Sequence, residues 1–255
     1  MEAVIYICHG SRLTESKKES IDLIEKVKER VNVPIQETCF LELQDPTLAQ
    51  AVDNAVEQGA TELYIMPILL LTAGHAKKDI PAMIEREQAR YPELSVHYGR
   101  AIEVEPKMID ILVDRIYACT DDPATYDILL VGRGSSDQQA VGDTETLAEM
   151  LRHRFPANRI EKCFLAASEP KFEPFLADKV QQGKSVLVLP YILFTGLLDR
   201  GIKDYVKTFE LETGQEILLT DYLGHHSIIV DILTERVLEV REGASTDATM
   251  AERSS

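Results

Sequence analysis

The sequence contains one pattern twice, and this repeat constrains the fold more than any other feature. His9-Gly10-Ser11 recurs as Arg133-Gly134-Ser135, 124 positions later. Identical residues stand at the same offset in three more places: Phe40-Leu41 with Phe164-Leu165, Pro46 with Pro170, and Gly59 with Gly183. Turn-forming glycines and prolines held in register over this distance indicate a duplicated domain.

Each half alternates short apolar runs with segments of helical period. The strand-like runs of the first half are residues 4–8, 35–41, 63–71 and 94–98. Between the second and third runs, Leu48, Ala51, Val52 and Ala55 recur at the spacing of one buried helix face. Such alternation predicts an α/β fold in which each lobe is a parallel sheet flanked by helices.

The repeat also predicts the boundary between the two lobes. We expect an N-terminal lobe at 1–121 and a similar C-terminal lobe at 122–242. Residues 243–255 are small, polar and aperiodic, so a mobile tail is expected there.

Ser16-x-x-Glu19 matches a capping box and predicts that the first helix begins at this point.

Composition excludes several classes of partner. The chain carries 43 acidic and 27 basic residues, a formal charge of −16, which disfavours nucleic acid and anionic lipid. No apolar run approaches the ~18 residues of a membrane span, and no signal peptide is visible, so a cytoplasmic protein is expected. The four cysteines form no C-x-x-C pair and are expected to be reduced core residues.

Three polar clusters follow the first three strand-like runs of the N-terminal half. They contain His9, Glu42 and His75. In open parallel sheets, ligands bind beyond the carboxyl ends of the strands, so these side chains are expected to share one edge. Imidazole is a good ligand for Fe, Co, Ni and Zn, and a nearby carboxylate can tune it or move protons.

A histidine at a strand end is more often a structural residue than a ligand, and the repeat helps to separate the two interpretations. The counterparts of His9 and His75 in the second half are Arg133 and Leu198. If the fold itself needed both histidines, the second copy would keep similar polar residues. Their restriction to the first copy indicates a function located there, while Arg133 keeps a positive group suited to an acidic ligand.

Two other motifs carry weaker signals. Ser11 and Ser135 follow glycines, but neither lies in the G-x-S-x-G motif of a hydrolase. The segment Gly132–Asp137 lacks both G-x-G-x-x-G and a G-K-[ST] ending, yet its backbone N–H groups could hold a carboxylate or phosphate. A plain turn is an equally good interpretation of that segment.

The sequence resembles the class II tetrapyrrole chelatases, in particular the long bacterial sirohydrochlorin ferrochelatases. The resemblance rests on V-I-Y-I-C-H-G-S-R at 4–12, F-L-E-L-Q-D-P at 40–46, P-I-L-L-L-T-A-G-H-A-K-K-D-I-P at 67–81, G-R-G-S-S-D at 132–137 and P-Y-I-L-F-T-G at 190–196. It covers about residues 3–240, nearly the whole chain.

The resemblance implies two flavodoxin-like lobes facing each other across a cleft. It implies insertion of Fe²⁺ into sirohydrochlorin, with cobalt or nickel used by relatives, and no tightly bound cofactor. His9 and His75 would bind the metal and accept protons, with Glu42 as the acidic partner. The substrate-binding positions would be Ser11, Arg12, Leu70, Leu71, Thr72, Ala73, Gly74 and Arg133. Lys77, Lys78 and Arg100 are further basic residues that could pair with substrate carboxylates or be solvated surface charges.

A chain that carries both lobes is expected to be a monomer. Other functions stay open at this stage. The protein could be a sirohydrochlorin cobaltochelatase, a carrier that holds a metal or tetrapyrrole without turnover, or a phosphate-ligand enzyme that uses Gly132–Ser136.

Overall fold

A computed structural model describes the backbone of residues 1–224 and 226–253, with side chains given for all of these except His75 and residues 244–253. The chain divides into two compact units. The first contains residues 1–103 together with 229 onwards, and the second contains residues 104–228. They are called lobe 1 and lobe 2 below.

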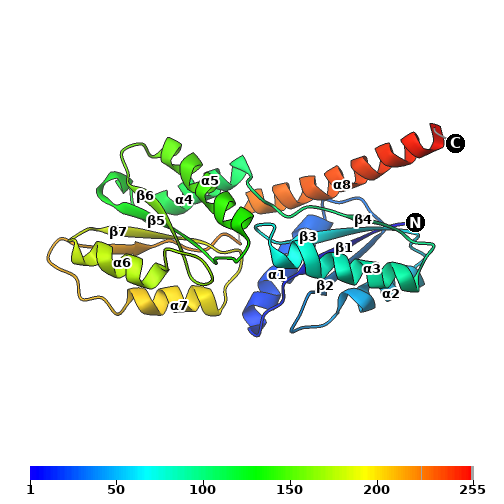
Figure 1. Cartoon of the computed structure of the whole chain (residues 1–255), viewed down its shortest axis with the longest axis horizontal. Helices are drawn as coiled ribbons and strands as arrows, with labels where there is room; N and C mark the ends of the chain where they lie inside the picture. Colours follow the sequence, from blue (N-terminus) through cyan, green and yellow to red (C-terminus); the bar gives the residue numbers. More distant parts are fainter. Residues whose placement is uncertain (225, 254–255) are drawn as a thin grey trace. The chain divides into compact units, whose positions relative to one another are not determined.

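Both lobes alternate strands and helices in the same order (Figure 1). Lobe 1 contains β1 (Glu2–Cys8), α1 (Thr14–Lys28), β2 (Ile35–Phe40), α2 (Leu48–Glu57), β3 (Glu62–Ile68), the π-helix η1 (His75–Asp79), α3 (Ile80–Arg90), β4 (Ser95–Tyr98) and α8 (Ser227–Arg253). Lobe 2 contains α4 (Pro106–Tyr117), the short 3₁₀ turn η2 (Pro123–Thr125), β5 (Asp127–Gly132), α5 (Gln138–Arg154), β6 (Ile160–Phe164), α6 (Phe172–Gln181), β7 (Val186–Tyr191), α7 (Leu197–Val206) and β8 (Ile217–Leu219).

Each lobe is built on a four-stranded parallel sheet, and the two strand orders are equivalent. Lobe 1 has the order β2-β1-β3-β4 and lobe 2 the order β6-β5-β7-β8. Every pairing within the two sheets is parallel. The predicted α/β fold with one parallel sheet per lobe is therefore confirmed.

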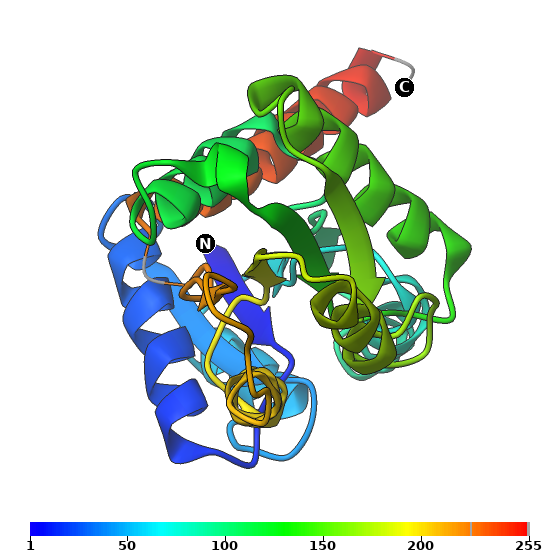
Figure 2. The same ribbon diagram turned by 90° about the vertical axis from the view of Figure 1, so that its left-hand side faces the viewer.

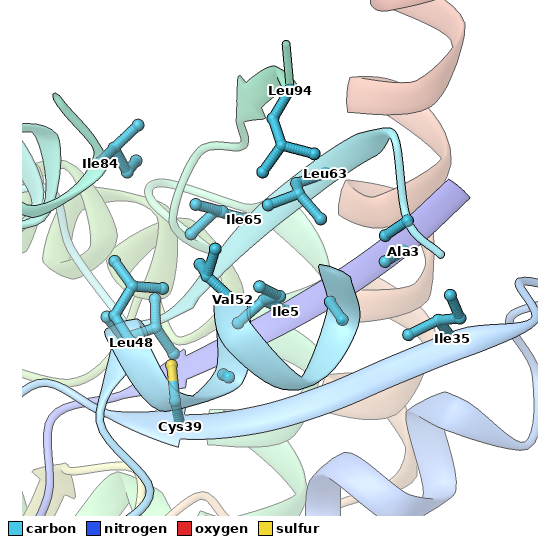
Figure 3. Close-up of a cluster of buried hydrophobic side chains, with 14 of the residues drawn as sticks. Ala3, Ile5, Ile35, Cys39, Leu48, Val52, Leu63, Ile65, Ile84 and Leu94 are labelled. Atoms are coloured by element: carbon cyan, nitrogen blue, oxygen red, sulfur yellow. The ribbon is translucent and has the colours of Figure 1, made fainter. Parts of the chain in front are cut away.

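One apolar core of lobe 1 lies between its sheet and helices α2 and α3. Alternate residues of β1 (Ala3, Ile5 and Ile7) point to this side, as expected for a strand whose side chains alternate between faces. They meet the buried stripe of α2 (Leu48, Ala51, Val52 and Ala55) (Figure 3). Lobe 2 repeats this arrangement, with Leu129 and Val131 of β5 packed against Phe172 and Leu176 of α6. Burial of these apolar faces is the main force that holds each helix on its sheet.

The loops after the second strand of each lobe are also equivalent in detail. Phe40 N donates to Pro46 O and Phe164 N donates to Pro170 O, both at 2.9 Å. Both loops hold a cis X-Pro bond, at Pro46 and at Pro170. The duplication seen in the sequence is thus reproduced in the backbone.

The boundaries of the two units differ from those expected from the repeat. The repeat predicts 1–121 and 122–242, whereas the contacts divide the chain after residues 103 and 228. The reason is that α4 follows β4 but packs against α5 and β7. Likewise α8 follows β8, but Asp231 pairs with Arg30 of α1 and Arg241 pairs with Glu2 of β1 at 2.6 Å. Each lobe thus holds the helix that follows the other lobe's last strand.

Two local expectations also change. Helix α1 begins at Thr14, not at Ser16, because Ser16 lies on the buried face of the helix and cannot serve as its cap. In the expected tail 243–255, the backbone is helical as far as Arg253, and α8 is one continuous helix (Figure 1, Figure 2). The residues after Arg253 lie outside the described part.

Within the described residues, no helix has both the length and the apolar character to cross a membrane. All four cysteines are free thiols, as expected, and Cys8, Cys39 and Cys163 are buried.

Candidate functional site

The carboxyl ends of three adjacent strands of lobe 1, β2, β1 and β3, lie at the same level. Cys8, the last residue of β1, is in register with Phe40 at the end of β2 and with Ile68 at the end of β3. The loops that follow therefore leave the sheet side by side. This register brings the segment after Cys8 next to the segment after Phe40, as the sequence predicts.

The pairing of β1 with β2 continues beyond the strands and sets the position of His9. Leu41 N donates to Cys8 O at 2.8 Å, and Glu42 N donates to His9 O at 3.2 Å. This places the Glu42 carboxylate beside the imidazole, with His9 Nδ1 and Glu42 Oε1 3.5 Å apart. Two of the three predicted central residues are therefore brought together by the main chain.

The surroundings of Nδ1 favour one tautomer of His9. Nδ1 lies 3.3 Å from Gly10 O and 3.5 Å from the Glu42 carboxylate, and both of these groups only accept hydrogen bonds. A neutral ring consequently carries its proton on Nδ1, which leaves the lone pair on Nε2. Nε2 is shielded from solvent, whereas the side chain as a whole is 26% exposed. An imidazole oriented by a carboxylate in this way is suited to bind a metal ion or to accept a proton.

Gly10 makes the close approach of the two loops sterically feasible. Its φ of +92° is unfavourable for other residues, and a Cβ at this position would collide with the carbonyl oxygen of Glu42. Gly134 of lobe 2 has φ of +87°, and a Cβ there would collide with Ala166 O in the same way. The backbone geometry thus belongs to the fold, and what lobe 1 adds is the pair of side chains, His9 and Glu42.

The loop after β3 leads to the third predicted residue. Leu69 O accepts from Ile102 N at 3.0 Å and Leu70 O accepts from Glu103 N at 2.7 Å, which continues the pairing of β3 with the segment after β4. His75 then begins η1. Single π-helical turns are rare and occur often at functional sites. The position of the His75 side chain lies outside the described part, so its predicted role stays a prediction.

The π-helix is anchored to β4 by a buried tyrosine. The hydroxyl of Tyr98 donates to Ala76 O at 3.0 Å, one residue after His75. Burial raises the pKa of Tyr98 well above its ordinary value, so the hydroxyl stays protonated as a donor. This contact fixes the backbone next to His75.

The remaining predicted residues of this edge fall into two groups. Ser11 has a structural role, because its Oγ accepts from Leu13 N at 3.2 Å in the turn that enters α1. Leu70, Leu71, Thr72 and Ala73 are half-buried, while Gly74 and Arg12 are exposed. Arg133 is exposed at the matching strand end of lobe 2. No structural observation tests their roles in substrate binding.

Sequence reasoning missed Glu103. Its carboxylate accepts from Thr72 Oγ1 at 2.7 Å and pairs with Arg100 Nη1 at 3.2 Å. Arg100 was considered above as a partner for substrate carboxylates, but here it is paired with Glu103 and Glu239. The hydrogen bond that Arg100 donates to Glu239 is the largest cause of the raised pKa of Arg100, so this guanidinium stays charged. Within the described side chains, no group of three or more His, Cys, Asp or Glu residues is arranged to hold a metal ion.

Comparison with known proteins places both halves of the chain in one group. The CbiX family model matches twice, at residues 3–119 and 127–240. A sirohydrochlorin ferrochelatase of Priestia megaterium is 42% identical over 93% of this chain and 90% of the relative. A sirohydrochlorin cobaltochelatase of the same organism is 32% identical over 95% of this chain and 81% of the relative.

Solved structures agree with these sequence matches. SirB from Bacillus subtilis with Fe³⁺ superposes with a TM-score of 0.86 at 32% identity, covering 96% of this chain and 97% of SirB. The sirohydrochlorin chelatase SirB of Bacillus subtilis subspecies spizizenii, in complex with cobalt, gives a TM-score of 0.84 at 32% identity, with the same coverage.

Proposed function

This chain belongs to the CbiX family, and we propose that it is a sirohydrochlorin ferrochelatase, which inserts Fe²⁺ into sirohydrochlorin and releases two protons. The observation that carries the proposal is the geometry of His9 at the end of β1. Its Nδ1 faces two acceptors, so Nε2 presents a lone pair at the sheet edge where α/β proteins bind ligands. The reaction itself is inferred from the similarity to ferrochelatases over nearly the whole chain.

Metal insertion needs a ligand that takes the ion from water and a base that takes the two pyrrole N–H protons. His9 serves both purposes in turn. Nε2 first binds Fe²⁺, and after the ion has moved to the ring nitrogens, Nε2 is free to accept a proton. Glu42 stabilises the imidazolium that forms, because its carboxylate lies beside Nδ1–H. Iron stays in the +2 state throughout, and no reductant is needed.

His75 supplies the second imidazole in this proposal. It is a second ligand for the ion and the acceptor of the other pyrrole proton. Its place on a π-helical turn, next to the anchored Ala76, supports such a role. Two neutral histidines leave open positions on a divalent ion, and the tetrapyrrole nitrogens can take these up.

The tetrapyrrole is bound by the loop after β3 and by basic residues. Leu70, Leu71, Thr72, Ala73 and Gly74 form the surface for the ring, with Ser11 at the turn beside it. Arg12 and Arg133 pair with the substrate carboxylates. Exposed pairs of this kind contribute only ~0–1 kcal/mol each, so they orient the ring more than they hold it. The protein acts as a monomer, without a tightly bound cofactor or a nucleic acid partner.

The decisive test is anaerobic insertion of Fe²⁺ into sirohydrochlorin, followed by the change in visible absorption. We expect several product molecules per protein, because an enzyme turns over. His9→Ala and His75→Ala should each lower kcat by about 10²- to 10⁴-fold, the usual effect of losing an acid–base group. His153→Ala is the matched control, because His153 is exposed on α5 in lobe 2.

Two outcomes would reject the proposal. A reaction that stops after one equivalent of product would indicate a carrier, and normal rates in both histidine variants would remove the assigned residues. The cobaltochelatase relative and the cobalt complex of SirB support one alternative, insertion of Co²⁺. Initial rates with Fe²⁺ and Co²⁺ under the same conditions decide between the two metals.

A further inference from the structure

Glu103 has a backbone conformation that a glutamate rarely adopts. Its φ is +62°, in the left-handed region, where any residue with a Cβ is disfavoured. The residue directly follows Ile102, whose N–H continues the pairing with β3 by donating to Leu69 O. An unfavourable conformation at this point is maintained only if the surrounding contacts hold it.

Two contacts of Glu103 lead to the loop that precedes His75. Its N–H donates to Leu70 O at 2.7 Å, and its Oε1 accepts from Thr72 Oγ1 at 2.7 Å. One residue therefore holds the loop twice, once through its main chain and once through its side chain. Thr72 lies three residues before His75, at the entry to η1.

The other carboxylate oxygen of Glu103 contacts Arg100, and Arg100 is in turn bound by Glu239 of helix α8. Oε2 lies 3.2 Å from Arg100 Nη1, and Arg100 forms two further bonds to Glu239, at 3.0 and 3.1 Å. Glu239 also accepts from Arg236 Nη1 at 2.8 Å.

Arg236 continues this connection back to the segment that carries Glu103. Its side chain is 3% exposed, and its guanidinium donates to Ala101 O and Ile102 O at 3.4 and 3.0 Å. Burial opposes ionisation of Glu239, but the hydrogen bond from Arg100 and the charges of both arginines outweigh it and lower its pKa. The carboxylate of Glu103 is consequently held in a connected, charged network rather than on a mobile side chain.

Lobe 2 has no counterpart of the contact between Glu103 and Thr72 among its described residues. Leu223 N donates to Ile192 O as Ile102 N does to Leu69 O, so Gly224 stands where lobe 1 has Glu103. Thr195, the counterpart of Thr72, instead donates to Asp199 in the first turn of the following helix α7, at 3.4 Å. The carboxylate at the position of Glu103 therefore occurs only in the lobe that contains the histidines, and the fold of a lobe does not require it.

We infer that Glu103 is a positioning residue: through Thr72 it fixes the loop at Leu70–Gly74 and thereby the placement of His75. The inference rests on the proposed function only in the identity of His75 as a metal ligand. Glu103 acts through the loop and does not itself contact the ion or the ring.

The test compares Glu103→Gly, Glu103→Gln and Thr72→Val with the control Glu93→Gln, at an exposed site of the same lobe. Glycine removes the carboxylate but accepts φ of +62° without cost, so the fold is preserved and the melting temperature stays near that of the unchanged protein. We expect Glu103→Gly and Thr72→Val to lower kcat by about 10- to 100-fold, as the loss of an outer support does. In Glu103→Gly, KM for sirohydrochlorin should stay unchanged, because Glu103 does not contact the ring. Glu103→Gln, which keeps an oxygen acceptor for Thr72, should lose less. Thr72→Ser should recover most of the activity lost in Thr72→Val.

A second readout needs no turnover. The unchanged protein is titrated with Co²⁺ in the absence of tetrapyrrole, and the visible absorption of the bound ion gives the affinity. Glu103→Gly should weaken Co²⁺ binding in the same direction as His75→Ala. If the unchanged protein inserts no metal, the proposed function fails, while this titration still tests the placement of His75.

Four results would overturn the inference, and three of them concern kinetics or metal binding. The first is an unchanged kcat and Co²⁺ affinity in Glu103→Gly. The second is a rise in KM alone in Glu103→Gly, which would mean that the carboxylate acts on the tetrapyrrole directly. The third is an equal loss of activity in Thr72→Ser and Thr72→Val. A lower melting temperature with normal kcat would assign Glu103 to stability only and would equally refute a positioning role.

Discussion

A Cβ on Gly10 would collide with the carbonyl oxygen of Glu42, so the backbone of the first loop and that of the second touch where His9 and Glu42 lie. The same relationship joins Gly134 to Ala166 in lobe 2. Two equivalent contacts, one with the candidate site and one without it, make it feasible to separate the stability of the fold from the chemistry.

Gly10→Ala and Gly134→Ala should therefore destabilise the protein by similar amounts and differ in activity. Each places an alanine at a positive φ, which costs about 1–2 kcal/mol, and each forces a loop apart. Only Gly10→Ala displaces Glu42 from His9, so only this variant should lose metal insertion. Urea unfolding gives the stability, and kcat at a temperature where both variants are folded gives the chemistry. Equal loss of activity in the two variants would contradict the assignment of the site to lobe 1.

Glu42→Gln tests the orienting role of the carboxylate. Glutamine keeps the shape of the side chain, but its amide can present either a donor or an acceptor to His9 Nδ1. The tautomer is then no longer fixed, and we expect kcat to fall about 10- to 100-fold. Glu57→Gln, on the exposed surface of α2, is the control. A Glu42→Gln variant as active as the control would show that the contact at 3.5 Å has no part in the reaction.

Acid should weaken lobe 2 through Glu145. Hydrogen bonds from Lys162 and Arg152 lower the pKa of Glu145 below its ordinary value. A carboxylate whose pKa is lower in the folded state stabilises the protein above its unfolded pKa of ~4.3, and this contribution disappears as the pH falls through the folded value. Since the side chain is 34% exposed, the contribution is only about 0–1 kcal/mol.

Glu145→Gln should consequently be less stable than the unchanged protein at pH 7, and the difference should shrink toward zero as the pH is lowered below 4. Urea unfolding at several pH values measures this, with the exposed Glu149 of the same helix, as Glu149→Gln, for comparison. A difference that is independent of pH would show that packing, not charge, is responsible.

Fragments test which helices complete each lobe. Residues 104–228 contain lobe 2 with α4, whose buried face includes Met108, Ile111 and Leu112. We expect this fragment to unfold cooperatively in urea. Fragment 122–242, which follows the sequence repeat, lacks α4 and leaves the apolar surface it covers exposed, so it should aggregate or unfold without a sharp transition. Cooperative unfolding of 122–242 alone would show that α4 is dispensable.

Much of the fold is predictable from the sequence because the repeat and the strand pattern carry it. The offset that joins Gly10 to Gly134 places the same turn in both lobes, and the adjacency of β1 and β2 brings His9 to Glu42. The sequence did not predict which lobe α4 and α8 each belong to. Both helices have apolar faces of the same period, and such a face does not specify which of two similar sheets it covers.

Local details of the site were hidden for other reasons. Glu103 has no signal in the sequence, because left-handed backbone is predicted at glycine or asparagine, not at glutamate. Ser16 matches a capping motif, yet tertiary burial decides the start of α1 two residues earlier. In both cases the contacts of the folded lobe outweigh local preference.

The exchange of final helices has a consequence for the order in which the protein can mature. Most of lobe 1 is formed by residues 1–103. Helix α8, which completes this lobe, follows lobe 2 in the sequence and is therefore synthesised after it. Chains generally fold domain by domain as they leave the ribosome, from the N-terminus onward. The sheet of lobe 1, whose edge carries His9, therefore lacks α8 until lobe 2 has been synthesised. Arg236, which donates to Ala101 O and Ile102 O, is likewise made only after lobe 2.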